Sequence, residues 1–191
     1  HSGTVSFDNN SYKTADTVTI TVEDLDLNAD SDLVDIYTTV VSPPAPADDP
    51  IVDIVGEAGL PTGLSFGDLG FLLDVRFNDI QWKDYSGDAG ACTVGAGIDN
   101  GLGATGFTLV ETDSDSGVFV GDCQIPAAFC REGATASESV TGLDIEVNYV
   151  DFRDASGEVI EVGDSAGVRA NTGSVSLDRT VYPVPFGVPD N

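Results

Sequence analysis

One segment decides the fold class. Residues Thr17–Glu23 read Thr-Val-Thr-Ile-Thr-Val-Glu, so threonine alternates with valine or isoleucine. Successive side chains of a β-strand point to opposite faces, and this alternation therefore predicts a strand with one buried and one solvent-facing side. The β-branched residues that fill it favour extended backbone. Because the chain also has no long amphipathic helical pattern, we predict an all-β protein.

Further strand-like segments are separated by turn-forming residues. We predict strands at residues 5–7, 16–23, 33–41, 51–55, 71–82, 106–111, 118–125, 143–150 and 158–162. Residues 112–117 and 151–157 have the composition of hairpin turns. This spacing predicts an immunoglobulin-like antiparallel β-sandwich. Such domains have about 100 residues, and the excess lies in two long loop insertions, 42–70 and 83–105.

The two ends of the chain resemble each other. Residues 3–12 (GTVSFDNNSY) and 173–182 (GSVSLDRTVY) are identical at five of ten positions. The identical pairs are Gly3 and Gly173, Val5 and Val175, Ser6 and Ser176, Asp8 and Asp178, and Tyr12 and Tyr182. We therefore predict an immunoglobulin-like domain at residues 1–172, with 173–191 as the first strand or linker of a following repeat.

An acidic segment follows the alternating strand. Oxygen-bearing side chains occupy alternate positions there: Asp24, Asp26, Asn28, Asp30 and Asp32. Groups of like charge this close repel one another unless a cation lies among them, although a solvated acidic turn is the alternative. The spacing resembles the calcium loop of EF-hands, but Ala29 replaces the glycine, and strands flank the loop instead of helices. We therefore do not predict an EF-hand, and the loop shares with EF-hands only the spacing of its ligands.

Two other acidic loops should lie close to this one. Alternate connections of a sandwich emerge at the same end, which predicts that residues 24–32, 112–117 and 151–157 meet there. Converging carboxylates with few basic residues nearby suit a calcium ion, which takes six to eight oxygen ligands. The predicted calcium ligands are Asp24, Asp26, Asn28, Asp30, Asp32, Asp113, Asp115, Asp151, Asp154 and Glu158.

Charge limits the possible partners. The 191 residues have a formal net charge of −26, and the seven Lys and Arg residues do not cluster. We therefore expect no nucleic-acid partner and no binding to anionic lipid. No segment is apolar enough to span a bilayer, so we expect no direct membrane insertion. Bound small cations or high salt would relieve the self-repulsion, as in a calcium-rich extracellular setting or the cytoplasm of an extreme halophile.

Three cysteines and one sequon suggest covalent features. The favoured disulfide joins Cys92 and Cys130, which lie in loops beside the same predicted hairpin, and the rival pairing is Cys123 with Cys130. Cys123 lies within a predicted strand and is expected to be a small buried apolar residue. Asn9 begins an N-glycosylation sequon, Asn9-Asn10-Ser11. The only histidine is His1, no catalytic triad can be built, and we predict that the protein is not an enzyme.

Four segments carry a family resemblance. VTITVEDLDLNADSDLVDIYTTV, TGFTLVETDSDSGVFVGD, TGLDIEVNYVDFRDASGEVIEVGDSAGVRANTG and SLDRTVYPVPFG resemble repeats of the surface-layer (S-layer) proteins of ammonia-oxidising thaumarchaea. The resemblance implies a very large secreted protein of tandem immunoglobulin-like domains that coats the cell as a two-dimensional lattice. Calcium and glycosylation are common in such layers. The implied location is extracellular, at the cell surface, and the implied partners are other copies in the lattice and neighbouring tandem domains.

The expected function is thus that of a structural module in a calcium-stabilised archaeal S-layer, with an acidic surface that enriches small cations. Two alternatives remain. One is an adhesin or ligand-binding module that uses the 42–70 loop. The other is a filament subunit whose segment 174–184 completes the sheet of a neighbour.

Overall fold

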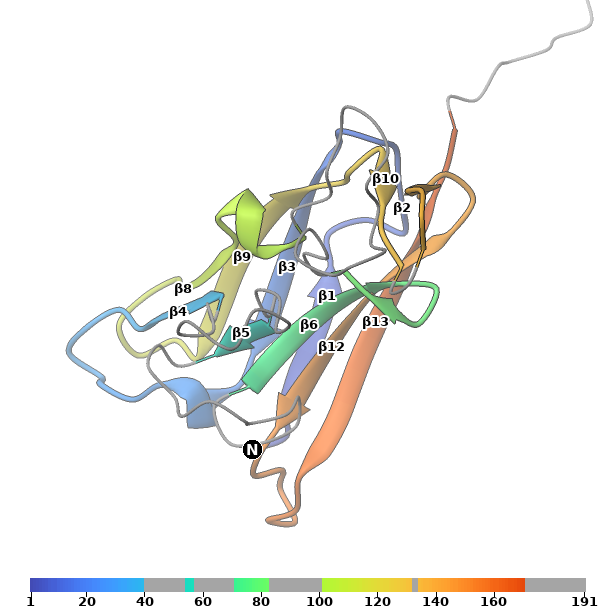
Figure 1. Cartoon of the computed structure of the whole chain (residues 1–191). Coiled ribbons are helices and arrows are strands. Elements are labelled where there is room, and N and C mark those ends of the chain that lie inside the picture. The colour runs from blue at the N-terminus through green and yellow to red at the C-terminus, as the bar shows by residue number, and fades with distance from the viewer. Residues whose placement is uncertain (40–53, 57–70, 83–100, 132–133, 171–191) are drawn as a thin grey trace, which may run out of the picture.

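The structure is a computed structural model that describes residues 1–39, 54–56, 71–82, 101–131 and 134–170 (Figure 1). Within these ranges the chain forms strands and two short 3-10 helices, η1 (Leu25–Leu27) and η2 (Gly103–Thr105), and no α-helix. The strands are β1 (Thr4–Phe7), β2 (Ser11–Tyr12), β3 (Thr17–Glu23), β4 (Ile36–Thr39), β5 (Ile54–Gly56), β6 (Phe71–Phe77), β7 (Ile80–Gln81), β8 (Thr108–Glu111), β9 (Val118–Gln124), β10 (Ala128–Phe129), β11 (Glu138–Ser139), β12 (Asp144–Asp151) and β13 (Ile160–Val168). The prediction of an all-β protein is confirmed.

The strands form one long hydrogen-bonded path that folds back on itself, antiparallel throughout except for its last pair, β13 and β2. Its order is β1-β3-β9-β8-β4-β5-β6-β12-β13-β2, with β7 on β6, and β10 and β11 make a separate pair. In Figure 1, β1, β3, β9 and β8 lie on one side and β6, β12 and β13 on the other, with β4 and β5 linking them. This arrangement is consistent with a β-sandwich.

The first twelve residues close the sandwich along one side. β1 pairs antiparallel with β3 in the first layer, whereas β2 pairs parallel with β13 in the second. β1 also lies beside β13, because the Phe7 N–H donates to Asp164 Oδ2 at 2.8 Å. One segment therefore joins both ends of the hydrogen-bonded path.

The core follows from the alternation in the strands. Val18, Ile20 and Val22 of β3 are completely buried, while the threonines between them are exposed or half-buried. The opposite layer contributes further fully buried side chains, among them Leu73, Val75 and Phe77 from β6 and Ile145, Val147 and Tyr149 from β12. Each buried aliphatic or phenyl side chain stabilises the fold by roughly 1.5 to 3 kcal/mol, so the two inner faces hold the layers together.

Residues 71–82 do not form the single strand that we predicted. β6 ends at Phe77, and β7 returns alongside it, with Phe77 opposite Ile80. The turn residues Asn78 and Asp79 have φ values of 46° and 64°. Two consecutive positive φ angles make a tight hairpin turn, and Asn and Asp tolerate them better than most residues. The prediction of one continuous strand was wrong because it overlooked this turn chemistry.

Two strand boundaries also differ from the prediction. β4 begins at Ile36 instead of residue 33, because Asp35 still belongs to the acidic loop, where its carboxylate accepts the Asp30 N–H. β13 continues to Val168 instead of ending at residue 162. Glycines weaken a strand pattern in a sequence, yet Gly163 and Gly167 keep their register with β12. Neighbouring strands thus hold β13 extended beyond its own sequence signal.

Several predictions concern residues outside the described part of the chain. The structure describes only 54–56 of the insertion at 42–70 and only 101–105 of the insertion at 83–105. The domain boundary at residue 172 and the segment 173–191 also lie outside it. Among the described residues, no helix is long and apolar enough to cross a membrane.

The cysteines that the structure describes behave differently. Cys123 on β9 is buried as expected and carries a free thiol, whose pKa burial raises to about 12. Cys130 is also buried and is disulfide-bonded. The rival pairing of Cys123 with Cys130 is therefore excluded. Pairing of Cys130 with Cys92 stays a prediction, because Cys92 lies outside the described residues.

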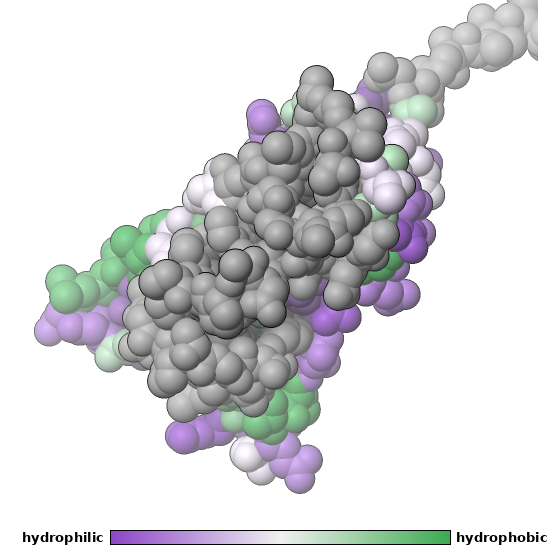
Figure 2. All heavy atoms as spheres, viewed as in Figure 1, coloured by the Kyte–Doolittle hydropathy of each residue, from purple (hydrophilic) through white to green (hydrophobic). Residues whose placement is uncertain are grey.

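An exposed apolar strip crosses the outer face of the first layer. Ile36 on β4 and Val110 on β8 stand directly opposite each other in the sheet and are 59% and 40% exposed. Leu33 and Val34, in the loop that leads into β4, are exposed as well. Figure 2 shows apolar side chains gathered on this side of the molecule, at the left of the view. We call Leu33, Val34, Ile36 and Val110 the apolar strip.

Candidate functional site

Three acidic loops meet at one end of the sandwich, which we call the acidic pole. They are residues 24–35 after β3, 112–117 between β8 and β9, and 152–159 between β12 and β13. The Asp24 N–H donates to the Gly117 carbonyl at 2.8 Å, and Asn28 Nδ2 donates to Asp115 Oδ1 at 3.0 Å. Tyr149, near the end of β12, donates its hydroxyl to Asp24. The structure therefore brings together the loops that the sequence predicts to meet.

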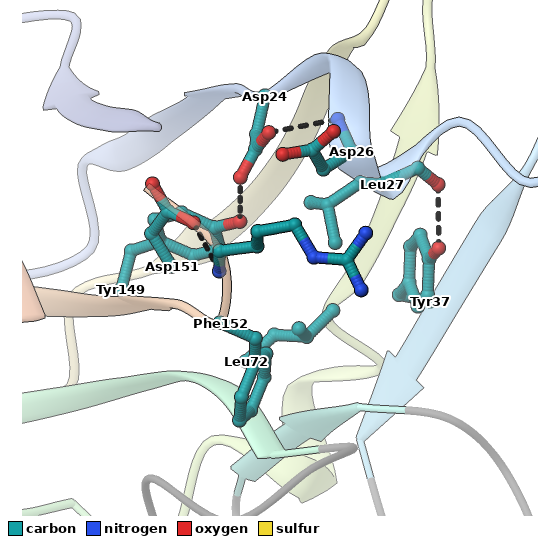
Figure 3. Close-up of a pocket in the computed structure, with 9 residues that line it drawn as sticks. Asp24, Asp26, Leu27, Tyr37, Leu72, Tyr149, Asp151 and Phe152 are labelled. Carbon is teal, nitrogen blue, oxygen red and sulfur yellow. Dashed lines mark hydrogen bonds between the residues drawn. The ribbon is translucent and has the colours of Figure 1, made fainter. Parts of the chain in front are cut away.

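Asp24 lies at the centre of the pole and is only 4% exposed. Its Oδ2 accepts the Tyr149 hydroxyl at 2.5 Å, and its Oδ1 accepts the Asp26 N–H at 2.8 Å (Figure 3). The second bond caps the N-terminus of η1, a position at which an aspartate side chain satisfies a backbone N–H that has no partner within the helix. Two strong donors thus solvate this buried carboxylate.

Electrostatics at Asp24 follow from this burial. Desolvation raises the pKa of Asp24 above its ordinary value, and the charges of Asp151 and Asp26 act in the same direction. The hydrogen bonds from Tyr149 and the Asp26 N–H oppose that rise in pKa. Burial, together with Asp24, raises the pKa of the Tyr149 hydroxyl. Tyr149 therefore remains protonated and keeps donating to the carboxylate.

Asp151 is completely buried at the end of β12 and holds the start of β1. Its Oδ2 accepts the Gly3 N–H at 2.8 Å, and its Oδ1 accepts the Arg153 N–H at 2.9 Å. A Cβ atom on Gly3 would lie 2.5 Å from Tyr149 Cε1 and 2.9 Å from Asp24 Oδ2. Glycine is thus required here, because the backbone approaches two buried side chains too closely for any other residue.

Glu111, at the end of β8, joins two of the loops. Its buried carboxylate accepts the N–H groups of Ser116 and Gly117 through Oε1 at 3.1 and 3.0 Å. Its Oε2 accepts the Asp35 N–H at 3.2 Å. One side chain therefore closes the 112–117 hairpin and ties it to the loop after β3.

Of the other acidic residues of the first loop, Asp26, Asp30 and Asp32 are exposed and Asp35 is half-buried. Asp26 Oδ2 lies 3.6 Å from the amino group of His1. Asp30 Oδ1 accepts the Asp32 N–H at 2.9 Å, and Asp35 accepts the Asp30 N–H at 3.2 Å. Side chains that bond backbone two residues further on make Asx turns. Asp30 therefore stabilises the local loop conformation.

The hairpin acids have the same local role. Asp113 Oδ1 accepts the Ser114 N–H at 2.8 Å. Asp154 Oδ1 accepts the N–H groups of Ser156 and Glu158 at 2.8 and 2.9 Å. The bonds from Ser156 and the Glu158 N–H lower the pKa of Asp154 below its ordinary value. This carboxylate is charged at neutral pH and closes the turn between β12 and β13.

Only part of the predicted calcium site has features that suit a cation. Among the described residues, no three Asp, Glu, His or Cys side chains form a group that could hold a metal ion. The buried Asn28 Oδ1, however, has no hydrogen-bond partner in the described part of the chain, while Nδ2 of the same side chain contacts Asp115. Carboxamide and carboxylate oxygens are ordinary calcium ligands. Calcium binding stays a prediction, with Asn28 and Asp115 as its best-fitting pair.

A pocket of about 380 Å³ opens at the acidic pole. Its lining consists of Asp24, Asp26, Leu27, Tyr37, Leu72, Tyr149, Asp151, Phe152 and Arg153. Figure 3 shows the carboxylates of Asp24 and Asp26 on one side and the apolar side chains of Leu72 and Phe152 on the other. Three carboxylates, those of Asp24, Asp26 and Asp151, against the one guanidinium of Arg153 leave the lining acidic, which suits a small cation that also has an apolar part.

Asn9, the predicted glycosylation site, is exposed in the turn between β1 and β2. Its Nδ2 donates to Asp8 Oδ2 at 2.7 Å, and its N–H donates to the Tyr12 hydroxyl oxygen at 2.9 Å. Surface exposure is what a glycan acceptor needs. Glycosylation of Asn9 stays a prediction.

Sequence reasoning missed the residues that organise the pole without being acidic. Tyr149 has the appearance of an ordinary core position in an alternating strand, and Gly3 precedes the first strand. The one available signal for Gly3 is its identity with Gly173 in the terminal repeat. For Tyr149 no local pattern distinguishes a tyrosine that solvates a buried carboxylate from one that only packs.

Comparison with known proteins gives no family assignment. A scan against models of protein families finds no match, and a search of curated proteins finds no significant similarity.

Proposed function

We propose that this chain is an immunoglobulin-like structural module of a secreted, calcium-stabilised S-layer lattice. The all-β fold, the net charge of −26 and the resemblance of its strand and loop segments to S-layer repeats support this proposal. The first segment, which changes from one layer to the other between β1 and β2, is compatible with a sandwich of immunoglobulin type. Other copies of the chain are the expected partners.

The observation that carries the proposal is the apolar strip. Exposed apolar side chains on adjacent strands are costly on a soluble surface and often mark an interaction site. Ile36 and Val110 face solvent side by side, beside the acidic loops that contain Asp35 and the 112–117 hairpin. A second copy of this chain would bury the strip and bring two acidic rims together.

Charge makes that contact depend on cations. Two copies with a net charge of −26 each repel one another, and the repulsion is strongest where acidic loops face each other. Calcium ions bound between the rims would neutralise it, and the unpaired Asn28 Oδ1 beside Asp115 offers oxygen ligands for such an ion. The lattice is therefore expected to assemble with calcium and to dissolve with a chelator.

Assembly in calcium tests the proposal. Sedimentation and electron microscopy of the wild-type chain should show sheets in calcium and monomers in sodium chloride of equal ionic strength. The double variant Ile36→Ser, Val110→Ser should remain monomeric in calcium. Val159→Ser is the matched control, because Val159 is equally exposed at 59% but lies outside the strip, and it should assemble normally.

The possible failures are distinguishable. Absence of any assembly of the wild-type chain in calcium would contradict the lattice function. Normal sheets from the double variant would keep the lattice but reject the strip as its contact.

A ligand-binding module is the second candidate, and the pocket at the acidic pole favours it. The pocket would take a small organic cation, such as an aliphatic amine. Titration calorimetry with butylammonium, and with Asp26→Asn as the variant that removes a charge from the lining, separates this function from assembly.

A further inference from the structure

The first twelve residues run alongside the last described strand in the same direction. Gly3 bonds to Asp151, which stands opposite Ile160 at the start of β13. Phe7 bonds to Asp164 in the middle of β13. Ser11 and Tyr12 then pair in parallel register with Gly167 and Val168 at the end of β13. The first segment and β13 therefore run parallel to each other along their whole length.

Four hydrogen bonds hold the seam between the first segment and the β12–β13 pair: one to Asp151 at the end of β12, and three along β13 and the residue that follows it. Two are made by buried or half-buried carboxylates: the Gly3 N–H to Asp151 at 2.8 Å and the Phe7 N–H to Asp164 at 2.8 Å. Two are backbone bonds, from the Gly167 N–H to Asn10 O at 3.2 Å and from the Arg169 N–H to Tyr12 O at 2.8 Å. Bonds to charged acceptors are stronger than neutral ones. Both halves of the seam are thus bridged.

The side chain of Asp164 is placed for this role. In the β12–β13 pair, Asp164 stands opposite Val147, and its neighbours on the same face, Val162 and Ala166, stand opposite Tyr149 and Ile145. Because Ile145, Val147 and Tyr149 point into the core, Asp164 points to the same inner side. It reaches the edge of β1 instead of solvent.

The two ends of the seam lie at opposite ends of the molecule. β1 begins at the acidic pole, where the N-terminus is marked in Figure 1, and β13 ends at the far end. The nine residues of β13 span about 30 Å at roughly 3.3 Å per residue. A force that separates residue 1 from residue 170 therefore acts along the seam and not across it.

We propose that the domain bears tension, with the β1–β2 segment and the β12–β13 pair acting as a shear-loaded clamp. When the ends are pulled apart, the first segment must slide along β13. The four bonds then share the load and must break together. If the segment is instead peeled from one end, the bonds break one after another, and the load at any moment falls on a single bond.

The clamp needs neither calcium nor lattice assembly. It requires only that neighbouring chain pulls on both ends of the domain. A module that joins others in series experiences that geometry whatever the larger protein does.

Single-molecule force spectroscopy of the full chain in two pulling directions tests the clamp. In the first, handles are attached to the N- and C-termini and load the seam in shear. In the second, one handle stays at the N-terminus and the other replaces the exposed side chain of Ala155 as a clickable unnatural residue. Ala155 lies beside the start of the chain, since its N–H contacts Ser2 Oγ at 3.4 Å. This second direction peels the seam open.

The expected unfolding force is roughly twofold or more higher in the end-to-end direction, because four bonds share the load instead of one. Asp164→Ala should lower the end-to-end force. Glu161→Ala, which removes an exposed carboxylate from the same strand, should leave it unchanged. Equal forces in the two directions of the wild-type chain would overturn the proposal, even if Asp164→Ala failed to fold. An undiminished end-to-end force in folded Asp164→Ala would overturn the role of Asp164 in the clamp.

Discussion

At the scale of single residues, the acidic pole depends on one position without a side chain. Gly3 lets the backbone pass against the ring of Tyr149 and the carboxylate of Asp24 while its N–H reaches Asp151. The three side chains are themselves buried and hydrogen-bonded. They cannot move aside without losing those bonds, so the space at Gly3 is fixed from all sides.

Gly3→Ala should therefore destabilise the fold. The added methyl group would overlap the Tyr149 ring, and overpacking of this kind costs roughly 1 to 3 kcal/mol. Urea denaturation measures the loss in the free energy of unfolding. Gly167→Ala is the control, because its Cβ would lie 3.6 Å from the nearest atom, Asp144 Oδ1, and its stability should change by less than about 1 kcal/mol. Equal stability of Gly3→Ala and the wild type would contradict the packing described here.

A second residue-scale feature is the carboxylate of Asp8. Burial acts to raise its pKa, but hydrogen bonds from the Tyr12 hydroxyl and the Thr19 N–H outweigh burial and lower the pKa below its ordinary value. A carboxyl with a lowered pKa in the folded state stabilises the fold above its unfolded pKa, near 3.8. That stabilisation is lost as the pH falls through the folded pKa.

Asp8→Asn should consequently destabilise the chain more at about pH 6 than at about pH 2. The measurement is the difference in unfolding free energy between variant and wild type at both pH values. Asp122→Asn, on the exposed face of β9, is the matched control and should show a smaller change with pH. A difference for Asp8→Asn that did not shrink on acidification would contradict the assigned hydrogen bonds.

At the scale of elements, the loops of the acidic pole are held by carboxylates bonded to backbone N–H groups. Glu111 is the clearest case, because its buried carboxylate accepts bonds from Ser116, Gly117 and Asp35. These donors belong to two different loops. The side chain therefore replaces hydrogen bonds that neither loop could make by itself.

Glu111→Ala should leave the buried Gly117 N–H and the half-buried Asp35 N–H without this acceptor and destabilise the fold by roughly 1 to 3 kcal/mol. Glu111→Gln keeps one acceptor oxygen, so its free energy of unfolding should lie between those of Glu111→Ala and the wild type. Hydrogen exchange localises the effect: the amides of Gly117 and Asp35 should exchange faster in Glu111→Ala, while the Ile20 amide in β3 changes only with global stability. Unchanged exchange at both loop amides would contradict the capping role.

Elements with a strong local signal were predictable, and those set by neighbours were not. The alternation in Thr17–Glu23 and the turn residues at 112–117 predicted β3 and the β8–β9 hairpin. β2 is too short to have a pattern and exists because it pairs with β13. The candidate site likewise had a part that the sequence could predict and a part that it could not. Sandwich connectivity predicted that the three loops meet, but the partners of Asp24 and Asp151 depend on side-chain packing across two layers.

At the scale of the whole molecule, charge opposes folding. The 191 residues have a formal net charge of −26, and the ion pairs of the described ranges include two arginines, Arg76 with Asp74 and Arg131 with Glu138. The unfolded chain keeps its charges further apart. Electrostatic repulsion therefore lowers the stability of the folded chain, and salt, which shortens the range of the repulsion, reduces this loss.

Salt should thus raise the melting temperature. The screening length falls from about 30 Å at 0.01 M to about 3 Å at 1 M salt, and calorimetry over this range should show a steady increase. Choline chloride should act like sodium chloride, because choline screens charge but coordinates carboxylates poorly. A melting temperature that is independent of salt would show that repulsion is not a significant term.

The carboxylates that meet β1 have one more consequence. An uncovered strand edge invites pairing with a strand from another chain, which is how many β-proteins aggregate. The N–H groups of Gly3, just before β1, and of Phe7, at its end, already bond to Asp151 and Asp164. Any incoming strand would have to displace these two negative charges. Copies at high local concentration can therefore form contacts through the faces of their sheets. The two carboxylates protect this edge against edge-to-edge aggregation.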